Sequence, residues 1–143
     1  MRIISHRGNL CGPEENDNVP SKIQEAAERF LVEIDVWHIK NQWFLGHDKP
    51  EHLVSFEFIS HPNFIIHTKN LDALSSLINT DLHYFWHQAD DFTLTSKNLI
   101  WTYPNKKVTP NSIIVCQTQE EVKKYKSTKV WGICTDYVLG ELI

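Results

Sequence analysis

Two carboxylates stand two residues apart in an otherwise apolar segment, residues 31–37. If this segment forms a β-strand, the side chains of Glu33 and Asp35 point to the same face, because side chains alternate along a strand. Carboxylate oxygens are the ligands that hard cations such as Mg²⁺ and Ca²⁺ prefer. The spacing therefore predicts that Glu33 and Asp35 form the floor of a site for a divalent metal ion.

Several other apolar segments also end in a polar residue that could bind a ligand or transfer a proton. Parallel strands present their carboxyl ends at one edge of a sheet, so we expect these residues to converge on one site, as in barrels of alternating strands and helices. They are His6, His67 with Lys69, His87 and Asp136.

The elements that must position these residues follow from the apolar pattern, which predicts seven or eight strands and about four helices. A barrel of eight strand–helix units normally uses ~250 residues, whereas this chain has 143. The expected fold is therefore α/β, a pared-down (β/α)8 TIM-type barrel with some helices missing, in a single domain of residues 1–143. The expected strands are 2–5, 31–37, 43–48, 64–69, 84–87, 99–103, 112–116 and 130–136, the expected helices are 21–30, 51–60, 71–78 and 119–125, and 90–98 is expected to be a turn or hairpin.

Composition and charge exclude several classes of protein. The net charge of −4 and the absence of a basic stripe argue against a nucleic-acid-binding protein. No apolar stretch is long enough to span a bilayer, and the first residues lack the apolar core of a signal peptide. We therefore expect a cytoplasmic protein without stable membrane insertion. Its three cysteines, Cys11, Cys116 and Cys134, lack the spacing of a zinc site and are expected to be free thiols.

Four short motifs occur in an order that resembles the glycerophosphodiester phosphodiesterase family, which belongs to the barrels similar to phosphatidylinositol-specific phospholipase C. They span nearly the whole chain: residues 6–8 (His-Arg-Gly), 33–35 (Glu-Ile-Asp), 47–48 (His-Asp) and 132–136 (Gly-Ile-Cys-Thr-Asp).

The resemblance implies a role for several of these residues. His6 and His47 would be the acid–base pair, and Arg7 would contact phosphate. Glu33 and Asp35 would bind the metal ion, Mg²⁺ or Ca²⁺, together with a carboxylate that the family carries just before its first helix. For that third ligand two candidates remain, Asp17, which keeps the spacing to the helix, and Glu15, which keeps the residue type.

This chain also departs from the family pattern. The later Glu-x-Lys strand of the family reads here as residues 67–69, His-Thr-Lys, so an imidazole replaces a carboxylate. We assign His67 and Lys69 to substrate binding. The small domain that often follows the His-Asp motif is missing, because the chain continues directly into the next element after Lys49.

The function that the resemblance implies is metal-dependent hydrolysis of a glycerophosphodiester or a similar small phosphodiester. Such a substrate is anionic and its alkoxide leaves poorly, so the reaction needs positive charge and a proton donor. The alternative is a non-catalytic barrel, derived from such an enzyme, that binds phosphorylated ligands. A third reading, an enzyme acting on a lipid headgroup, lacks an amphipathic segment to support it.

Overall fold

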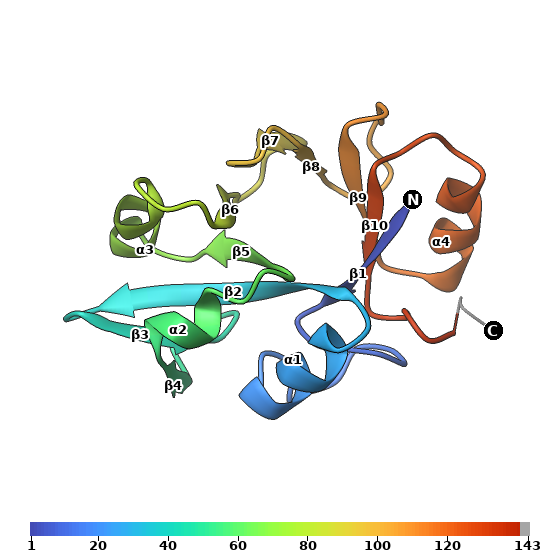
Figure 1. The fold of residues 1–143 in the computed structure, drawn as a ribbon. Coiled ribbons are helices and arrows are strands. Elements are labelled where there is room, and N and C mark those ends of the chain that lie inside the picture. The colour runs from blue at the N-terminus through green and yellow to red at the C-terminus, as the bar shows by residue number, and fades with distance from the viewer. Residues whose placement is uncertain (141–143) are drawn as a thin grey trace.

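The computed structural model describes residues 1–140, which form one strongly curled sheet with short helices on its outer face (Figure 1). In this part of the chain the strands are β1 (Arg2–His6), β2 (Leu31–Ile39), β3 (Gln42–Leu45), β4 (His52–Val54), β5 (Phe64–Thr68), β6 (His83–Trp86), β7 (Phe92–Leu94), β8 (Ile100–Thr102), β9 (Ser112–Cys116) and β10 (Gly132–Thr135). The helices described there are α1 (Pro20–Ala27), α2 (Phe56–Ile59), α3 (Leu71–Leu77) and α4 (Gln119–Lys126).

The wall of the curled sheet is built from parallel strands. Their order is β6-β5-β2-β1-β10-β9-β8, and every neighbouring pair in this series is parallel. The first and last strands of the chain, β1 and β10, thus lie side by side (Figure 1). The antiparallel strands are β7, which pairs with β8, and β3 and β4, which extend from the far half of β2. The parallel wall brings the carboxyl ends of its strands to one edge.

The expectation of a pared-down (β/α)8 TIM-type barrel is wrong. No ladder joins β6 to β8 among residues 1–140, so the sheet remains an open half-barrel of mixed strands. Helices are few and short because several connections are too short to hold one. Residues Lys40 and Asn41 turn the chain directly from β2 into the antiparallel β3. The region expected to be a turn or hairpin does form one, since β7 pairs back onto β8.

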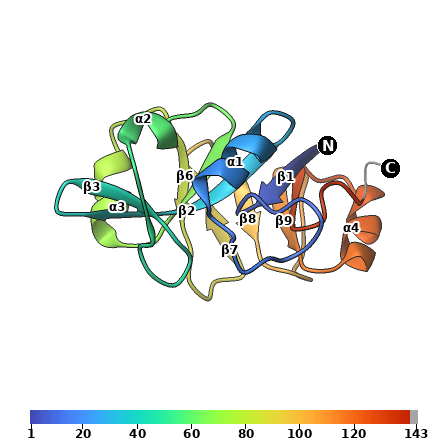
Figure 2. The same ribbon diagram turned by 90° about the horizontal axis from the view of Figure 1, so that it is seen from below.

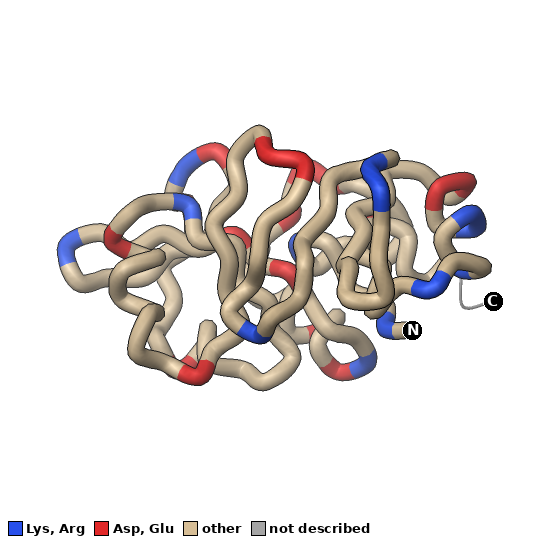
Figure 3. The backbone as a smooth tube through the Cα atoms, turned by 90° about the horizontal axis from the view of Figure 1, so that it is seen from above, with Lys and Arg blue, Asp and Glu red and all other residues tan. Residues whose placement is uncertain are grey.

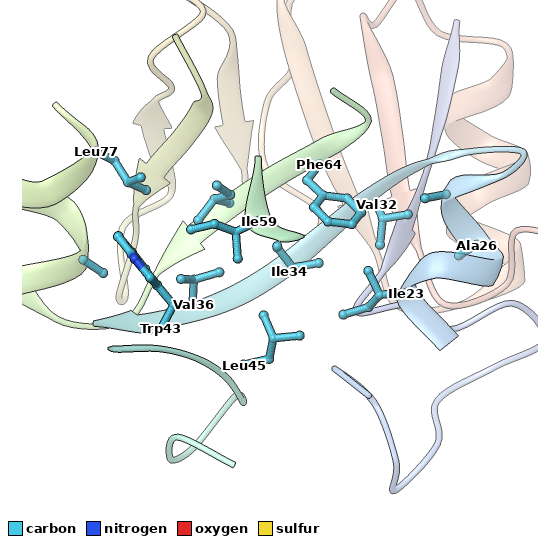
Figure 4. Close-up of a cluster of buried hydrophobic side chains, with 13 residues drawn as sticks. Ile23, Ala26, Val32, Ile34, Val36, Trp43, Leu45, Ile59, Phe64 and Leu77 are labelled. Atoms are coloured by element: carbon cyan, nitrogen blue, oxygen red, sulfur yellow. The ribbon is translucent and has the colours of Figure 1, made fainter. Parts of the chain in front are cut away.

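The outer face of the sheet carries most of the hydrophobic core. Helix α1 begins at Pro20, whose fixed φ suits the first helical turn, and it packs Ile23 and Ala26 onto β2. Helices α2 and α3 and strand β3 complete this layer over β2 and β5 (Figure 4), while α4 covers β9 and β10 at the other end (Figure 2). The buried residues labelled in Figure 4 are Ile23, Ala26, Val32, Ile34, Val36, Trp43, Leu45, Ile59, Phe64 and Leu77.

The inner, concave face is filled by a smaller cluster below the carboxyl ends of the strands. Phe85 of β6 stacks on Trp101 of β8 with 4.4 Å between ring centroids. This contact links two strands that do not pair with each other. Other buried members of the cluster are Ile4, Ile65, Leu99, Ile113 and Cys134. The cluster closes the bottom of the half-barrel and leaves its upper end to polar residues.

Strand β2 changes partner halfway along one edge. Residues Leu31–Glu33 pair with β1, whereas Val36–Ile39 pair with β3. Between the two ladders, the backbone N–H of Arg7 donates to the carbonyl of Glu33 (2.9 Å), and that of Gly46 donates to the carbonyl of Asp35 (3.2 Å). The sheet therefore forks beside the two carboxylates. The loop that follows β1 starts on one side of the fork, and the loop that follows β3 starts on the other.

Charged residues of both signs are spread along the chain. Lys and Arg positions are interspersed with Asp and Glu positions along the backbone in Figure 3, and the net charge is −4. Among the helices of residues 1–140, none is long and apolar enough to cross a membrane.

Candidate functional site

A cavity of about 310 Å³ opens at the carboxyl ends of the parallel strands. The residues of one wall are predicted site residues from four different segments, and the other wall is contributed by β8, β9 and the segment after β6. The first wall consists of His6, Arg7, Glu33, His47, His67 and Lys69. The second includes His87, Gln88, Trp101, Tyr103 and Gln117.

Glu33 of β2 lines this cavity, and Asp35 lies two residues further along the same strand. Glu33 is 1% exposed and Asp35 is fully buried. Glu33 is in register with His6 of β1, and Asp35 is in register with His67 of β5, so the two imidazoles flank the carboxylates on neighbouring strands. Glu33 and Asp35 share one face of β2, since both approach His67 Nδ1, and Glu33 Oε2 lies 3.7 Å from His6 Nε2.

Asp35 is surrounded by groups that stabilise its charge. Arg7 Nε lies 3.2 Å from its Oδ2, the same oxygen accepts a hydrogen bond from Asn18 Nδ2 (2.9 Å), and His67 Nδ1 lies 3.1 Å from Oδ1. Burial alone would raise the pKa of Asp35. The contacts with His67, Arg7 and Asn18 outweigh it, so the pKa of Asp35 is lowered and the group is ionised at neutral pH.

Glu33 has fewer partners. Its two oxygens lie 3.7 Å from His6 Nε2 and 3.8 Å from His67 Nδ1, and Oε2 has no hydrogen-bond partner among residues 1–140. Burial, followed by the charge of Asp35, raises the pKa of Glu33 to about 7. A buried carboxylate with an unpaired oxygen is costly unless a cation or a proton neutralises it.

His6 is oriented by a carboxylate on the neighbouring strand end. Its Nδ1 donates to Asp136 Oδ1 (3.0 Å), and the same oxygen accepts from Asn9 Nδ2 (2.8 Å). This bond leaves Nε2 of His6 facing Glu33 and the cavity. Although burial favours the neutral ring, the hydrogen bond to Asp136 and the charge of Glu33 prevail and raise the pKa of His6. His6 is therefore suited to accept a proton at Nε2 near neutral pH.

His47 reaches the cavity from the β3–β4 connection, outside the parallel wall. Its Nδ1 contacts Asp48 Oδ1 at 2.9 Å. The preceding residue, Gly46, has φ of +155°, and a Cβ at this position would lie 1.9 Å from the carbonyl oxygen of Lys49. Only glycine fits there, so the turn that presents His47 depends on Gly46.

The remaining predicted binding residues also line the cavity. Lys69 follows β5 and adds a second cationic side chain to the lining of the cavity. His87 is buried, both of its ring nitrogens lack a hydrogen-bond partner among the described residues, and its ring packs edge-on against Tyr103. His87 was predicted only as a polar residue at the end of a strand.

Three of these side chains could hold a metal ion. One ligand atom each from Glu33, Asp35 and His67 lies within 4.8 Å of the other two. The third donor is thus His67, which we had assigned to substrate binding. Asp17 instead pairs with Arg7 Nη1 (3.0 Å), and Glu15 is exposed. The buried, unpaired oxygens of Glu33 and Asp35 fit a cation, because they otherwise lack a partner.

Comparisons with protein-family models, curated proteins and solved structures find no match. The resemblance to glycerophosphodiester phosphodiesterases therefore rests on the quoted motifs alone.

The sequence pattern did not indicate two residues that position carboxylates of the site, Asn9, which contacts Asp136, and Asn18, which contacts Asp35. Asn18 has φ of +58°, a conformation that asparagine tolerates better than most residues. The neighbouring Asp17 was predicted as a metal ligand, but it is Asn18 that contacts a carboxylate of β2, through the hydrogen bond from Nδ2 to Asp35. Asn9 lies in the loop after β1, where no periodicity indicates which side chains turn inward.

Proposed function

We propose that this protein is a divalent-cation-dependent phosphodiester hydrolase acting on a glycerophosphodiester or another small phosphodiester, with His6 and His47 as the acid–base pair. One observation carries the proposal. His6, oriented by Asp136, faces the buried carboxylate of Glu33 in a cavity that His47 and Arg7 also line. The proposal keeps the cytoplasmic location and the small-molecule partner expected from the sequence.

The residues of the cavity suit this chemistry. Arg7 and Lys69 supply positive charge for the two non-bridging oxygens of the phosphodiester, which share one negative charge. A cation between Glu33 and Asp35 would neutralise charge that develops on the phosphoryl group. One imidazole takes the proton of the attacking hydroxyl as its oxygen bonds to phosphorus, and the other gives a proton to the leaving alkoxide as the P–O bond breaks. The attacking hydroxyl is either a neighbouring substrate hydroxyl, which yields a cyclic phosphate, or water.

A turnover assay tests the proposal. A general phosphodiester and glycerophosphodiesters are incubated with wild type, His6→Ala, His47→Ala and Glu33→Gln, in EDTA and in Mg²⁺, Ca²⁺, Mn²⁺ or Zn²⁺. We expect cation-dependent turnover that falls ~100- to 10,000-fold in each histidine variant. His61→Ala, which removes an exposed histidine outside the cavity, is the matched control. If no substrate is turned over with any of these cations, the proposed enzymatic activity is refuted.

A second candidate, a non-catalytic protein that binds phosphorylated ligands, is favoured by one contact pattern. Asp35 is already approached by Arg7 and by His67, so much of its charge is balanced within the protein. In that case inorganic phosphate or glycerol phosphate binds in the presence of EDTA, binding is lost in Arg7→Gln, and no substrate is turned over. Equilibrium binding measured beside the turnover assay separates the two functions.

A further inference from the structure

We propose that His67 is a metal ligand and that it makes the site selective for a first-row transition cation, Mn²⁺ or Zn²⁺, over Mg²⁺ and Ca²⁺. This inference rests on the proposed cation dependence and names the class of cation. It replaces the Mg²⁺ or Ca²⁺ expected when the donors were taken to be carboxylates alone.

The spacing of the three donors suits a small divalent cation. His67 Nδ1 lies 3.1 Å from Asp35 Oδ1 and 3.8 Å from Glu33 Oε1. Cation–ligand bonds of ~2.0–2.2 Å that meet at ordinary coordination angles place neighbouring ligand atoms roughly 3–3.6 Å apart. Small side-chain shifts would bring all three atoms onto one ion.

The hydrogen bond on the other side of the imidazole fixes where its lone pair points. His67 Nε2 lies 3.0 Å from the backbone carbonyl oxygen of His87. A carbonyl can only accept, so Nε2 carries the proton. In the neutral ring, Nδ1 therefore presents a lone pair to Glu33 and Asp35. A histidine that donates its far N–H to a backbone carbonyl is the usual arrangement of a metal-ligating imidazole.

The ring of His67 is also held in its plane. It stacks on Phe85 with 4.9 Å between centroids and 15° between planes. Phe85 is in turn buried against Trp101. The imidazole cannot rotate away from the carboxylates without disrupting this stack, so the donor is preorganised.

The rival arrangement is a protonated His67 that forms an ion pair with Asp35 and leaves no need for a cation. A proton on Nδ1 would then bond to Asp35 Oδ1. At 3.1 Å the two atoms are close enough, yet Oδ1 has no hydrogen-bond partner of acceptable geometry among residues 1–140. A cation held by both atoms would stabilise the charge of Asp35 in place of a proton on Nδ1.

The donor set then determines the cation class. Carboxylate oxygen suits Mg²⁺, Ca²⁺ and Mn²⁺, whereas imidazole nitrogen suits Zn²⁺ and other transition cations. Ca²⁺ also takes six to eight oxygen ligands, and Mg²⁺ is suited to carboxylate, carbonyl and water oxygens. A set of two carboxylates and one imidazole therefore favours Mn²⁺ and Zn²⁺.

Cation binding measured without substrate tests the inference. Calorimetric titrations with MnCl2, ZnCl2, MgCl2 and CaCl2 compare wild type with His67→Glu, and His61→Gln serves as the control because it removes an exposed histidine outside the cavity. We expect wild type to bind Mn²⁺ and Zn²⁺ at least tenfold more tightly than Mg²⁺ and Ca²⁺. His67→Glu should lose this preference, and His61→Gln should keep it.

Pulsed electron paramagnetic resonance of the Mn²⁺-loaded wild type tests directly whether a nitrogen atom binds the ion. Coupling of the Mn²⁺ electron spin to an imidazole nitrogen is expected, and it should vanish in His67→Glu if that variant keeps its circular dichroism spectrum. Equal affinity for all four cations, no cation binding, or bound Mn²⁺ without nitrogen coupling would overturn the inference. If Mn²⁺ binds through nitrogen but no phosphodiester is turned over, the proposed reaction fails and the metal site stands.

Discussion

Asn18 holds Asp35 through two hydrogen bonds, one to its side chain and one to its backbone. Asn18 Nδ2 donates to Asp35 Oδ2 (2.9 Å), and Asn18 Oδ1 accepts from the backbone N–H of Asp35 (3.0 Å). Both residues are fully buried. The loop before α1 is thereby tied to the carboxylate strand at the floor of the site.

This tie predicts that Asn18→Asp is strongly destabilising. The change removes the N–H donor and places a second carboxylate against Asp35, so the free energy of unfolding should fall by about 2–4 kcal/mol. Chemical denaturation in EDTA measures it. Asn18→Gly keeps the positive φ and adds no charge, and it should cost less. Equal stability of Asn18→Asp and wild type would show that the tie has no energetic importance.

Asp136 is predicted to set both the orientation and the pKa of His6. Asp136→Asn weakens the hydrogen bond to Nδ1 and removes a negative charge, so the pKa of His6 should decrease. The acidic limb of the pH–rate profile should then move to lower pH, and kcat should fall ~10- to 1,000-fold. Asp91→Asn, which alters an exposed carboxylate paired with Lys106, should leave the profile unchanged. An unaltered profile in Asp136→Asn would exclude the positioning role.

His87 is predicted to contact the substrate's alcohol group. Burial and the nearby His67 lower the pKa of His87, so the neutral ring offers one donor and one acceptor, the pair that a hydroxyl needs. His87→Phe removes both and should raise KM about tenfold with a smaller effect on kcat. His87→Gln, which keeps a donor and an acceptor, should recover part of the affinity. The idea fails if both variants share the wild-type KM.

A separate prediction concerns stability at acid pH. Burial, with a contribution from Lys97, lowers the pKa of His83 to about 4, and its Nε2 lies 2.8 Å from Thr95 Oγ1. The unfolded chain binds a proton near pH 6.5 and the folded chain does not, so stability is lost as pH falls from about 6.5 toward 4. Because the ring is partly exposed, this group should cost about 1–2 kcal/mol.

Denaturant titrations at pH 7 and pH 4.5 test this prediction. His83→Gln cannot take up the proton, so its stability should differ less between the two pH values than that of wild type. A difference as large as in wild type would mean that other groups carry the acid sensitivity.

The amino-acid sequence predicted which residues lie close together at the site better than it predicted the overall fold. Parallel strands present their carboxyl ends at the same edge whether or not the sheet closes into a barrel. The proximity of four residues on such strands was therefore predictable: His6, Glu33, Asp35 and His67. The antiparallel β3 was not predictable in this way. Its turn places Lys40 and Asn41 at positive φ, a conformation usually indicated by Asn-Gly, and the pair Lys-Asn gives little sign of it.

The third carboxylate shows a second limit. Asp17 and Glu15 lie in the irregular segment between β1 and α1, where no period of two or 3.6 residues assigns a direction to a side chain. In the structure Asp17 accepts a hydrogen bond from Arg7, and the residue beside the two carboxylates is His67, which lies on a regular strand.

The fork in β2 is bridged on the outer face of the sheet. His6 ends one branch and His47 follows the other, and one apolar layer joins the two, because Leu10 after β1 and Leu45 of β3 pack in the same cluster. Parting the branches would expose this apolar surface, so the arrangement of the two histidines should persist until the whole protein unfolds. Heat inactivation and loss of the circular dichroism signal should therefore share one midpoint.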